Sequence, residues 1–383
     1  MKCTSKSAGC GGCDTLDIEY KVQLEQKHEQ LKKLIGKFGT VEPVIAADEP
    51  LHYRCKIINT YAVNKRGEIA AGLYAKNTHK VINTSSCLLE DKLAQKAAQA
   101  VLYATQKCRY EPFNEDKGFG LVRHFLIRRA LYTNQLMVVV VTAQDILPGS
   151  KKFVAFMREK CPEITTVVQN VNAMRTSAVL GEKYKTLFGR GFIEDTLCDC
   201  RFVISPSSFY QVNPAQAQKL YETAIELAAL KEGETALDAY CGTGTIGIAA
   251  AKKSGASVAG VELNKDAVKD AIKNAKLNDA KNVRFYSSDA GKFMKKLAED
   301  HENVDCVFLD PPRDGSSEEF LSALCALKPA RIIYISCAPD SLARDLEYLL
   351  SRDKSYKIKK IVPVDMFPQT RHIETICLLS RTK

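Results

Sequence analysis

The stretch that decides the fold of this chain is Leu237-Asp-Ala-Tyr-Cys-Gly-Thr-Gly-Thr-Ile-Gly247. It follows a short apolar run and opens an Ala-rich segment, which is the pattern of a turn from a strand into a helix. Glycines at such a turn let the backbone approach a ligand closely, and the start of the helix attracts anionic groups. A lone Gly-x-Gly is weak evidence, because glycine is common at turns. Motifs elsewhere in the sequence are therefore needed to identify the ligand of this turn.

Short apolar runs and amphipathic helical stretches alternate around this turn. Such alternation predicts βαβ units and a doubly wound parallel sheet, which places this half of the chain in the α/β class. The second run ends in Glu262, 24 residues after Asp238, where a carboxylate can accept hydrogen bonds from ribose hydroxyls. The expected strands are residues 235–239, 258–262, 283–286, 305–309 and 331–336.

Two cofactors fit this arrangement, a dinucleotide and S-adenosylmethionine. Gly242, Gly244 and Gly247 match the dehydrogenase pattern Gly-x-Gly-x-x-Gly literally. The fourth strand, however, runs into Asp310-Pro-Pro-Arg313, which puts a carboxylate and a rigid loop at the carboxyl edge of the sheet. This order of motifs resembles a class I methyltransferase. Amino-group methyltransferases carry Asp-Pro-Pro followed by an aromatic residue, and the Arg at position 313 argues against that class.

Two further residues near strand ends indicate covalent chemistry. Cys337 follows the strand Arg331–Ser336 and is therefore expected to face the ligand crevice at the carboxyl end of the sheet. Glu374 follows a loop that contains proline and enters a final apolar strand. Taken alone, Cys337 could equally be a buried structural thiol and Glu374 a solvated carboxylate. The motifs around them decide between these interpretations.

Five motifs of the second half, in this order, resemble the uridine-5-methyltransferases of RNA. The resemblance implies that Cys337 is the nucleophile and Glu374 the general base. It leaves Arg344, Arg371 and His372 as candidates to activate the thiol. The motifs are Phe209-Tyr-Gln-Val-Asn213, Asp238–Gly244, Asp310-Pro-Pro-Arg313, Ser336-Cys-Ala-Pro-Asp-Ser-Leu-Ala-Arg-Asp345 and His372-Ile-Glu374.

The same resemblance implies a set of residues that contact S-adenosylmethionine. Four of them would touch the cofactor directly, and Asp289 would lie near its adenine. The four are Gln211, Tyr240, Glu262 and Asp310.

The chemistry of uracil explains why these residue types are needed. Carbon 5 of uracil is a poor nucleophile towards a methyl sulfonium. A thiolate that adds to carbon 6 generates an enolate, and carbon 5 then becomes reactive. After methyl transfer, a carboxylate can remove the proton from carbon 5, and elimination of the thiolate releases the product. Because carbon 6 is inaccessible in a stacked helix, we expect the target base to be flipped out.

Composition sets the general class of the protein. The chain has 383 residues, 45% apolar and 26% charged, which is typical of a folded protein with two or three domains and excludes overall disorder. No apolar run approaches the length of a membrane span, and the polar first residues lack a signal peptide, so we expect a cytoplasmic protein with no membrane partner. Fourteen cysteines in a reducing compartment indicate a metal or cluster site rather than a disulfide framework.

The first half has a different pattern and most of the positive charge. Its mixture of helical and strand-like stretches predicts an α+β domain. Residues 1–200 hold 29 Lys and Arg against 21 Asp and Glu, whereas residues 201–383 hold 26 against 24. The charge therefore predicts an RNA-binding domain over residues 1–200 and a methyltransferase domain over residues 201–383. The family resemblance, together with the cysteines described next, implies that the first of these domains also carries an iron–sulfur cluster.

A cysteine cluster lies at the start of the chain, in the pattern Cys3-x6-Cys10-x2-Cys13. Three thiolates need a fourth ligand, and spacing alone allows zinc or an iron–sulfur cluster. The resemblance favours a [4Fe–4S] cluster, because several members of the methyltransferase family hold one through this spacing and one distant cysteine. Cys87 occupies the matching place, and we prefer it to Cys55 and Cys108 as the fourth ligand.

The RNA substrate is the least determined part of the prediction. The cysteine pattern resembles ribosomal members of the family, as does the lack of an N-terminal TRAM barrel, so we expect 23S ribosomal RNA, methylated before or during subunit assembly. Transfer RNA is the alternative substrate. A small-molecule methyltransferase and a non-catalytic RNA-binding iron–sulfur protein are further alternatives. The basic hairpin over residues 123–129 is the candidate RNA contact, against the simpler interpretation of ordinary strand charge. No obligate protein partner is evident.

Overall fold

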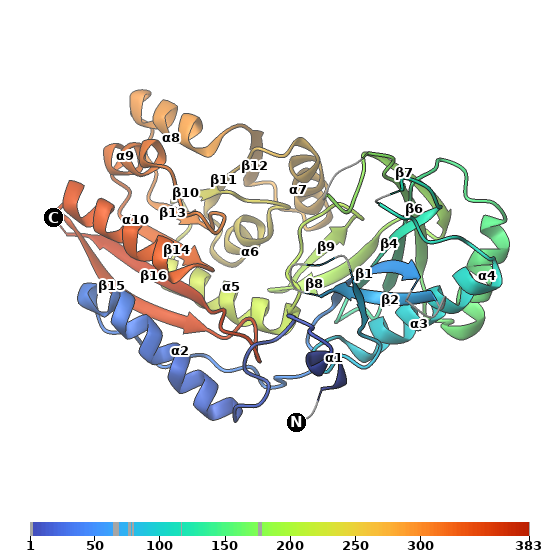
Figure 1. Cartoon of the computed structure of the whole chain (residues 1–383). Helices are drawn as coiled ribbons and strands as arrows, with labels where there is room; N and C mark the ends of the chain where they lie inside the picture. The colour runs from blue at the N-terminus through green and yellow to red at the C-terminus, as the bar shows by residue number, and fades with distance from the viewer. Residues whose placement is uncertain are drawn as a thin grey trace. The chain divides into compact units, whose positions relative to one another are not determined.

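The computed structural model describes residues 3–63, 69–75, 78, 80–115, 117–174 and 178–382. The chain forms two compact units, each made of segments that are not contiguous in sequence (Figure 1). The first unit contains Met1–Asp17, Glu49–Asp195 and Val203–Ser207, and the second contains Ile18–Asp48, Thr196–Phe202 and Ser208–Lys383. Residues 18–48 thus belong to the second unit, although the sequence assigned them to the first domain.

The second unit is built on a seven-stranded sheet in the order β12-β11-β10-β13-β14-β16-β15. The first five strands of this order are parallel, which confirms the predicted doubly wound sheet. The last two form an antiparallel hairpin that pairs with β14 at the edge. The strands are β10 (Thr235–Ala239), β11 (Ser257–Glu262), β12 (Val283–Ser287), β13 (Cys306–Leu309), β14 (Arg331–Ser336), β15 (Tyr356–Val364) and β16 (Glu374–Arg381).

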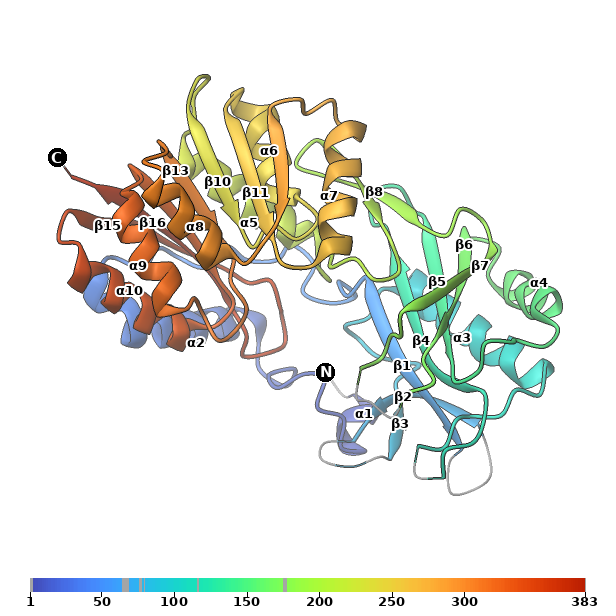
Figure 2. The same ribbon diagram turned by 90° about the horizontal axis from the view of Figure 1, so that it is seen from above.

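Helices cover both faces of this sheet (Figure 2). One layer contains α5 (Pro214–Ala228), α6 (Thr245–Ser254) and α7 (Lys265–Leu277). The other contains α8 (Ala290–Glu299), α9 (Glu318–Leu327) and α10 (Pro339–Arg352). Several of these helices begin with a side chain that accepts hydrogen bonds from the first free N–H groups, which defines their starts. These caps are Asn213, Asn264, Asp289 and Ser317.

The segment over residues 18–48 adds a helix to the second layer. Helix α2 (Tyr20–Ile35) packs against α10, and its buried Leu31 and Ile35 join the apolar core of this unit. A short 3₁₀ turn, η1 (Gly36–Phe38), ends the helix. The chain then forms single β-bridges with β15. The local sequence of α2 does not indicate this partner, because apolar periodicity identifies the buried face of a helix without showing what covers it.

The first unit contains a second seven-stranded sheet, in the order β3-β2-β1-β4-β5-β6-β7. Its pairs are antiparallel except β5 with β6. Helices α3 (Lys92–Lys107) and α4 (Ser150–Lys160) pack on each other and on the sheet, around a core that contains Phe125, Phe153 and Val138. The strands are β1 (Lys56–Val63), β2 (Ile69–Tyr74), β3 (Val81–Asn83), β4 (Val122–Arg129), β5 (Leu136–Thr142), β6 (Thr166–Val171) and β7 (Lys183–Phe188).

Three short elements complete the description. Helix α1 (Thr4–Ser7) lies in the cysteine-rich start of the chain, and the two-stranded ribbon of β8 (Ile193–Leu197) and β9 (Cys200–Ile204) is divided between the two units. Among the helices in the described ranges, none has the length and apolar character needed to cross a membrane.

Candidate active site

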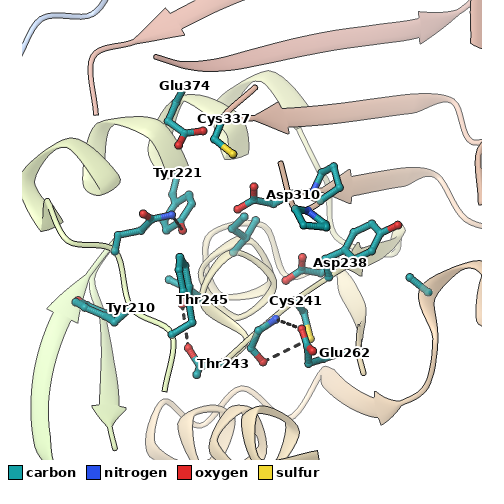
Figure 3. A pocket seen from close by; sticks show the side chains of 18 of the residues that line it. Tyr210, Tyr221, Asp238, Cys241, Thr243, Thr245, Glu262, Asp310, Cys337 and Glu374 are labelled. Carbon is teal, nitrogen blue, oxygen red and sulfur yellow. Dashed lines mark hydrogen bonds between the residues drawn. The ribbon is translucent and has the colours of Figure 1, made fainter. Parts of the chain in front are cut away.

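A cavity of about 650 Å³ lies in the second unit at the carboxyl ends of the parallel strands. Its lining comes from the ends of β10, β11, β13 and β14, from the start of β16 and from the segment before α5. This is the edge of an open α/β sheet where ligands bind, and the volume suits a cofactor-sized molecule. Figure 3 shows the labelled side chains projecting into it from different elements.

The glycine turn after β10 forms one wall of the cavity. Tyr240, Gly242 and Gly244 all have positive φ angles, of 63°, 53° and 81°, so the chain turns sharply before α6 begins. A Cβ at Gly244 would lie 2.5 Å from the ring of Phe285, and one at Gly247 would lie 2.9 Å from a carboxylate oxygen of Asp238. Glycine is therefore required at both positions, because a side chain would collide with its neighbours.

Two acidic residues close to the turn are held by backbone N–H groups. The Gly247 N–H donates to Asp238 Oδ2 at 2.8 Å, and burial raises the pKa of Asp238 to about 7. At the end of β11, Glu262 accepts from the N–H groups of Gly242, at 3.2 Å, and Asn264, at 2.8 Å. These bonds fix the orientation of the Glu262 carboxylate at the cavity wall (Figure 3).

The other residues predicted to contact the cofactor line the same cavity. Gln211 donates to the hydroxyl of Tyr221 at 3.2 Å, and the ring of Tyr240 packs on another aromatic ring, with centroids 5.4 Å apart. Asp289 caps α8 through its carboxylate. Asp310 is partly buried, and desolvation raises its pKa to about 7. The structure thus brings together all five predicted cofactor residues, from segments up to about a hundred positions apart.

Cys337 and Glu374, the predicted nucleophile and base, lie at one end of the cavity (Figure 3). Cys337 follows β14, and Glu374 is the first residue of β16. The antiparallel pairing of these strands puts Ser336 opposite Thr375, which brings the two functional residues to neighbouring positions. Cys337 is half-buried, whereas Glu374 is 5% exposed. Strand register therefore sets their proximity.

Burial controls the protonation of this pair. It raises the pKa of Glu374 to about 8, and the nearby carboxyl of Asp310 contributes to the rise. It also raises the pKa of Cys337 to about 11, with further contributions from Glu374 and Asp310. Arg313 acts in the opposite direction on both groups, because a positive charge favours the thiolate and the carboxylate. In the free protein at neutral pH, both groups are therefore mainly protonated.

Only part of the predicted set of activating groups lines this cavity. His372 does so, with its ring 6.1 Å from that of Phe367, whereas Arg344 is held away from it by Asp345. Arg371 is exposed and does not line it. Arg313 is a cation that favours the thiolate of Cys337, a role that its motif alone did not indicate. Its position directly after Asp-Pro-Pro was the available signal.

The four predicted cluster cysteines line a second, much smaller cavity in the first unit, of about 20 Å³. They are Cys3, Cys10, Cys13 and Cys87. Burial raises the pKa of Cys13, and the neighbouring thiols of Cys3 and Cys10 add to this rise. Cys55 and Cys108 do not line the cavity. The structure thus brings together residues that are more than seventy positions apart in the sequence.

A metal site does not follow from this convergence. Within the part of the chain that the structure describes, no group of three or more His, Cys, Asp or Glu side chains is arranged to hold a metal ion. The thiols have the donor chemistry of an iron–sulfur or zinc site. Neither the described residues nor the comparisons show the predicted cluster.

The basic hairpin proposed as an RNA contact has a different role at two positions. Arg123 is 3% exposed and donates to two backbone carbonyls at 2.9 and 2.7 Å. Arg129 pairs with Asp91, the cap of α3. These arginines stabilise the first unit, as the simpler interpretation of strand charge suggested. The other two basic residues of the hairpin, His124 and Arg128, are also largely buried.

Comparisons with known proteins agree with the cavity chemistry. The profile of the family described as tRNA (Uracil-5-)-methyltransferase matches residues 165–382. A protein of Caldanaerobacter subterraneus named as an uncharacterized RNA methyltransferase is 39% identical over 97% of this chain and 82% of its own length. A similarly named protein of Listeria monocytogenes is 40% identical, with the same two coverages.

A solved structure extends the likeness to the whole fold. It is the crystal structure of the tRNA (uracil-54, C5)-methyltransferase of Pyrococcus abyssi in complex with S-adenosyl-L-homocysteine. The TM-score is 0.80 at 29% sequence identity, and the match covers 97% of this chain and 86% of that one. Its ligand is the product that S-adenosylmethionine leaves after methyl transfer.

Proposed function

The chain belongs to the tRNA (uracil-5-)-methyltransferase family, and from that premise we propose that it methylates carbon 5 of a uridine in 23S ribosomal RNA through a covalent intermediate. The observation that carries the proposal is the placement of Cys337 and Glu374 together at one end of the cofactor cavity. A thiol and a carboxyl side by side are the two groups that this reaction needs.

The proposed reaction uses each group once. The Cys337 thiolate adds to carbon 6 of the uracil, and the electron pair of the 5,6 double bond moves onto the carbonyl oxygen at carbon 4. Carbon 5 of this enolate then attacks the methyl group of the sulfonium, the bond from methyl to sulfur breaks, and S-adenosylhomocysteine leaves as the carbonyl at carbon 4 re-forms. The Glu374 carboxylate takes the proton from carbon 5, the double bond re-forms, and the thiolate leaves carbon 6. Cys337 is restored, and Glu374 holds one proton to return to solvent.

The protonation states of Cys337 and Glu374 in the free site have to change before this reaction begins. A Cys337 pKa of about 11 and a Glu374 pKa of about 8 leave little thiolate and little carboxylate at pH 7. A sulfonium bound near Asp310 and Glu374 brings a positive charge that lowers the pKa of both carboxyls. We propose that Arg313 contributes in the same direction to the thiolate of Cys337. Cofactor binding thus prepares the site for the RNA.

The cofactor would be held by the five residues of the cavity wall. S-adenosylmethionine supplies the methyl group when it is bound. We propose that Glu262 accepts hydrogen bonds from the ribose hydroxyls and that Asp289 lies near the adenine. Gln211, Tyr240 and Asp310 would contact the remainder of the molecule.

The choice of RNA rests on two different observations. The cysteine pattern at the start of the chain supports ribosomal RNA, because it resembles the ribosomal members of the family. Transfer RNA is the second candidate, and the likeness to a tRNA (uracil-54, C5)-methyltransferase favours it. Tritium release from RNA labelled as [5-³H]uridine tests both, with 23S ribosomal RNA and transfer RNA assayed side by side. Release from transfer RNA alone would reject the ribosomal proposal, and release from neither would reject uridine methylation.

We further propose that Cys3, Cys10, Cys13 and Cys87 hold a [4Fe–4S] cluster in the assembled protein. Their convergence on one cavity supports this proposal. Such a cluster would tie the start of the chain to the segment after β3 and would have a structural role. No step of the methyl transfer depends on it.

A further inference from the structure

The loop between β15 and β16 presents residues to the catalytic end of the cavity. Phe367 and His372 of this loop line the cavity, and the loop ends at Glu374. Its path therefore determines where the carboxylate of Glu374 lies relative to Cys337. The loop has no regular structure of its own, so its position depends on the elements packed behind it.

Helix α2 holds this loop from behind through a buried ion pair. Lys27 Nζ donates to Asp365 Oδ1 at 2.6 Å and to the carbonyl oxygen of Phe367 at 3.2 Å. Lys27 is 3% exposed, and Asp365 is fully buried. The hydroxyl of Tyr20, about two turns earlier on the helix, donates to the other carboxylate oxygen at 2.9 Å. Both ends of the Asp365 carboxylate are thus bound by α2.

A second buried contact holds the tip of the loop. Gln23 Nε2 donates to Gln369 Oε1 at 2.8 Å, and the Gln369 N–H donates to Gln23 Oε1 at 3.1 Å. Gln369 has a φ of 66°, in the left-handed region that a non-glycine residue seldom adopts. The reciprocal pair with Gln23 stabilises this conformation, which lies between Phe367 and His372.

Docking of α2 does not by itself explain these contacts. The apolar side chains of Leu31 and Ile35 already anchor the helix in the core of the second unit. A buried charge pair adds little to stability, because the cost of removing both ions from water offsets most of their attraction.

The N-terminal end of α5 also binds the loop. Asn213 donates to the Met366 carbonyl at 3.0 Å, and Gln216 donates to the Asp365 carbonyl at 3.0 Å. Those bonds hold the start of the loop, whereas α2 also holds Phe367 and Gln369.

We infer that Lys27 and Gln23 are positioning residues for the proposed general base: they hold the loop from Asp365 to Ile373 so that Glu374 faces the adduct on Cys337. The inference rests on the proposed function, because it concerns the same site. Residues near the start of the chain, outside every catalytic motif, would then control the last step of the reaction. Methyl transfer itself depends on Cys337 and the cofactor wall, which α2 does not hold.

The test uses the full chain with both charges of the pair removed together, as Lys27→Met with Asp365→Asn. Removing one partner alone would leave a buried, unpaired charge and could prevent folding. Gln23→Met is the second variant, since it breaks the amide pair without changing charge. The matched control is Leu31→Ala, which weakens α2 packing without touching the loop. Each protein is assayed for S-adenosylmethionine affinity, turnover and covalent protein–RNA adduct on a denaturing gel.

We expect turnover in the double variant and in Gln23→Met to fall on the order of 10- to 100-fold, with methylated adduct accumulating and cofactor affinity within about twofold. Leu31→Ala should lower the melting temperature and leave the adduct fraction at the wild-type level. Wild-type turnover in both loop variants would overturn the inference, as would a loss of turnover without adduct. Glu374→Gln distinguishes a failure of this inference from a failure of the proposed function. If Glu374→Gln accumulates adduct and the loop variants do not, only this inference fails. If Glu374→Gln does not accumulate adduct, the proposed function fails.

Discussion

The catalytic cavity and the cysteine cavity are built in different ways. In the second unit, the catalytic cavity is lined from strand ends and helix starts, and the carboxylates of Asp238 and Glu262 are oriented by backbone hydrogen bonds. In the first unit, the cysteine cavity is lined from the segment around the four-residue helix α1 and from the turn that contains Cys87. Its thiols converge without forming a metal site among the described residues.

The difference shows how a scaffold determines the precision of a site. Residues at the ends of paired strands are placed by hydrogen-bond register, so Cys337 and Glu374 meet because β14 and β16 pair. Residues on short loops have no such register, and a bound ion or cluster would have to set their final geometry. Five predictions test this comparison, ordered from the largest expected effect to the smallest.

The first prediction concerns the nucleophile in the strand-based cavity. Cys337→Ala is expected to reduce methyl transfer on the order of 10³-fold or more, because the variant lacks the thiol proposed to form the bond to carbon 6. Affinity for S-adenosylmethionine should stay near the wild-type value, which isothermal titration measures. Cys241→Ala is the matched control, since this buried thiol also lines the cavity but belongs to the glycine turn. Full turnover of Cys337→Ala would exclude the covalent mechanism.

The second prediction concerns the base. Glu374→Gln is expected to lower turnover on the order of 10²- to 10⁴-fold, because the amide cannot remove the proton from carbon 5. The methylated RNA should remain attached to Cys337, and a denaturing gel with radioactive S-adenosylmethionine would show the adduct. The double variant with Cys337→Ala should show none. Normal product release by Glu374→Gln would assign the proton transfer to another group.

The third prediction is a pH dependence of the reaction. The pKa of Glu374, raised to about 8, and that of Cys337, raised to about 11, lie above neutrality, and both groups act in their deprotonated forms. Below saturation with S-adenosylmethionine, turnover is therefore expected to rise at least on the order of tenfold between pH 7 and pH 9, because the carboxylate fraction of Glu374 alone rises about tenfold. Steady-state tritium release in buffers of constant ionic strength measures this rise. A rate that is flat or falls over this range would show that the free-site pKa values do not govern the reaction.

The fourth prediction tests the cysteine cavity. If the thiols bind a [4Fe–4S] cluster, anaerobically prepared protein should contain about four iron and four sulfide per chain. Cys87→Ser should lose most of this content and lower the melting temperature of the protein by several degrees. Cys108→Ser should change neither, because Cys108 does not line the cavity. One zinc per chain without sulfide would replace the cluster with a zinc site, and no metal would reject both.

The fifth prediction concerns stability. Burial raises the pKa of Glu374 from 4.5 to about 8 in the folded protein, so the folded state binds more protons than the unfolded state between these values. This carboxyl therefore lowers stability progressively as pH rises from about 4.5 to 8. Glu374→Gln should melt a few degrees above wild type at pH 8 and close to it at pH 4.5. Equal melting temperatures at pH 8 would show that Glu374 ionises without cost in the folded protein.

Much of the second unit follows from local sequence signals. The alternation of apolar runs and helices predicted the doubly wound sheet, and the glycine turn with Asp310-Pro-Pro-Arg313 located the cofactor cavity. These signals are reliable because a parallel sheet places the carboxyl ends of its strands along one edge. The resemblance to RNA uracil-5-methyltransferases added the roles of Cys337 and Glu374, which remain predictions until the variants are measured.

Other features had no local signal. Arg123 and Arg129 look like a basic RNA contact in the sequence, but both are engaged inside the first unit, because a charged side chain does not indicate its partner. From the sequence alone, Lys27 is expected to be an ordinary lysine on the surface of an amphipathic helix. Its ion pair with Asp365 spans 338 positions, and no pattern within the helix could indicate it.

The sequence by itself determined the class of the fold, the family and the positions of the residues that line the catalytic cavity. These follow from periodicity and from motifs whose residues are close together in the chain. Only the tertiary structure decided that residues 18–48 join the second unit, that Arg313 is a cation acting on Cys337, and that α2 holds the loop before Glu374. Such relations depend on which surfaces pack together, and packing between distant segments is a property of the whole chain rather than of any stretch within it.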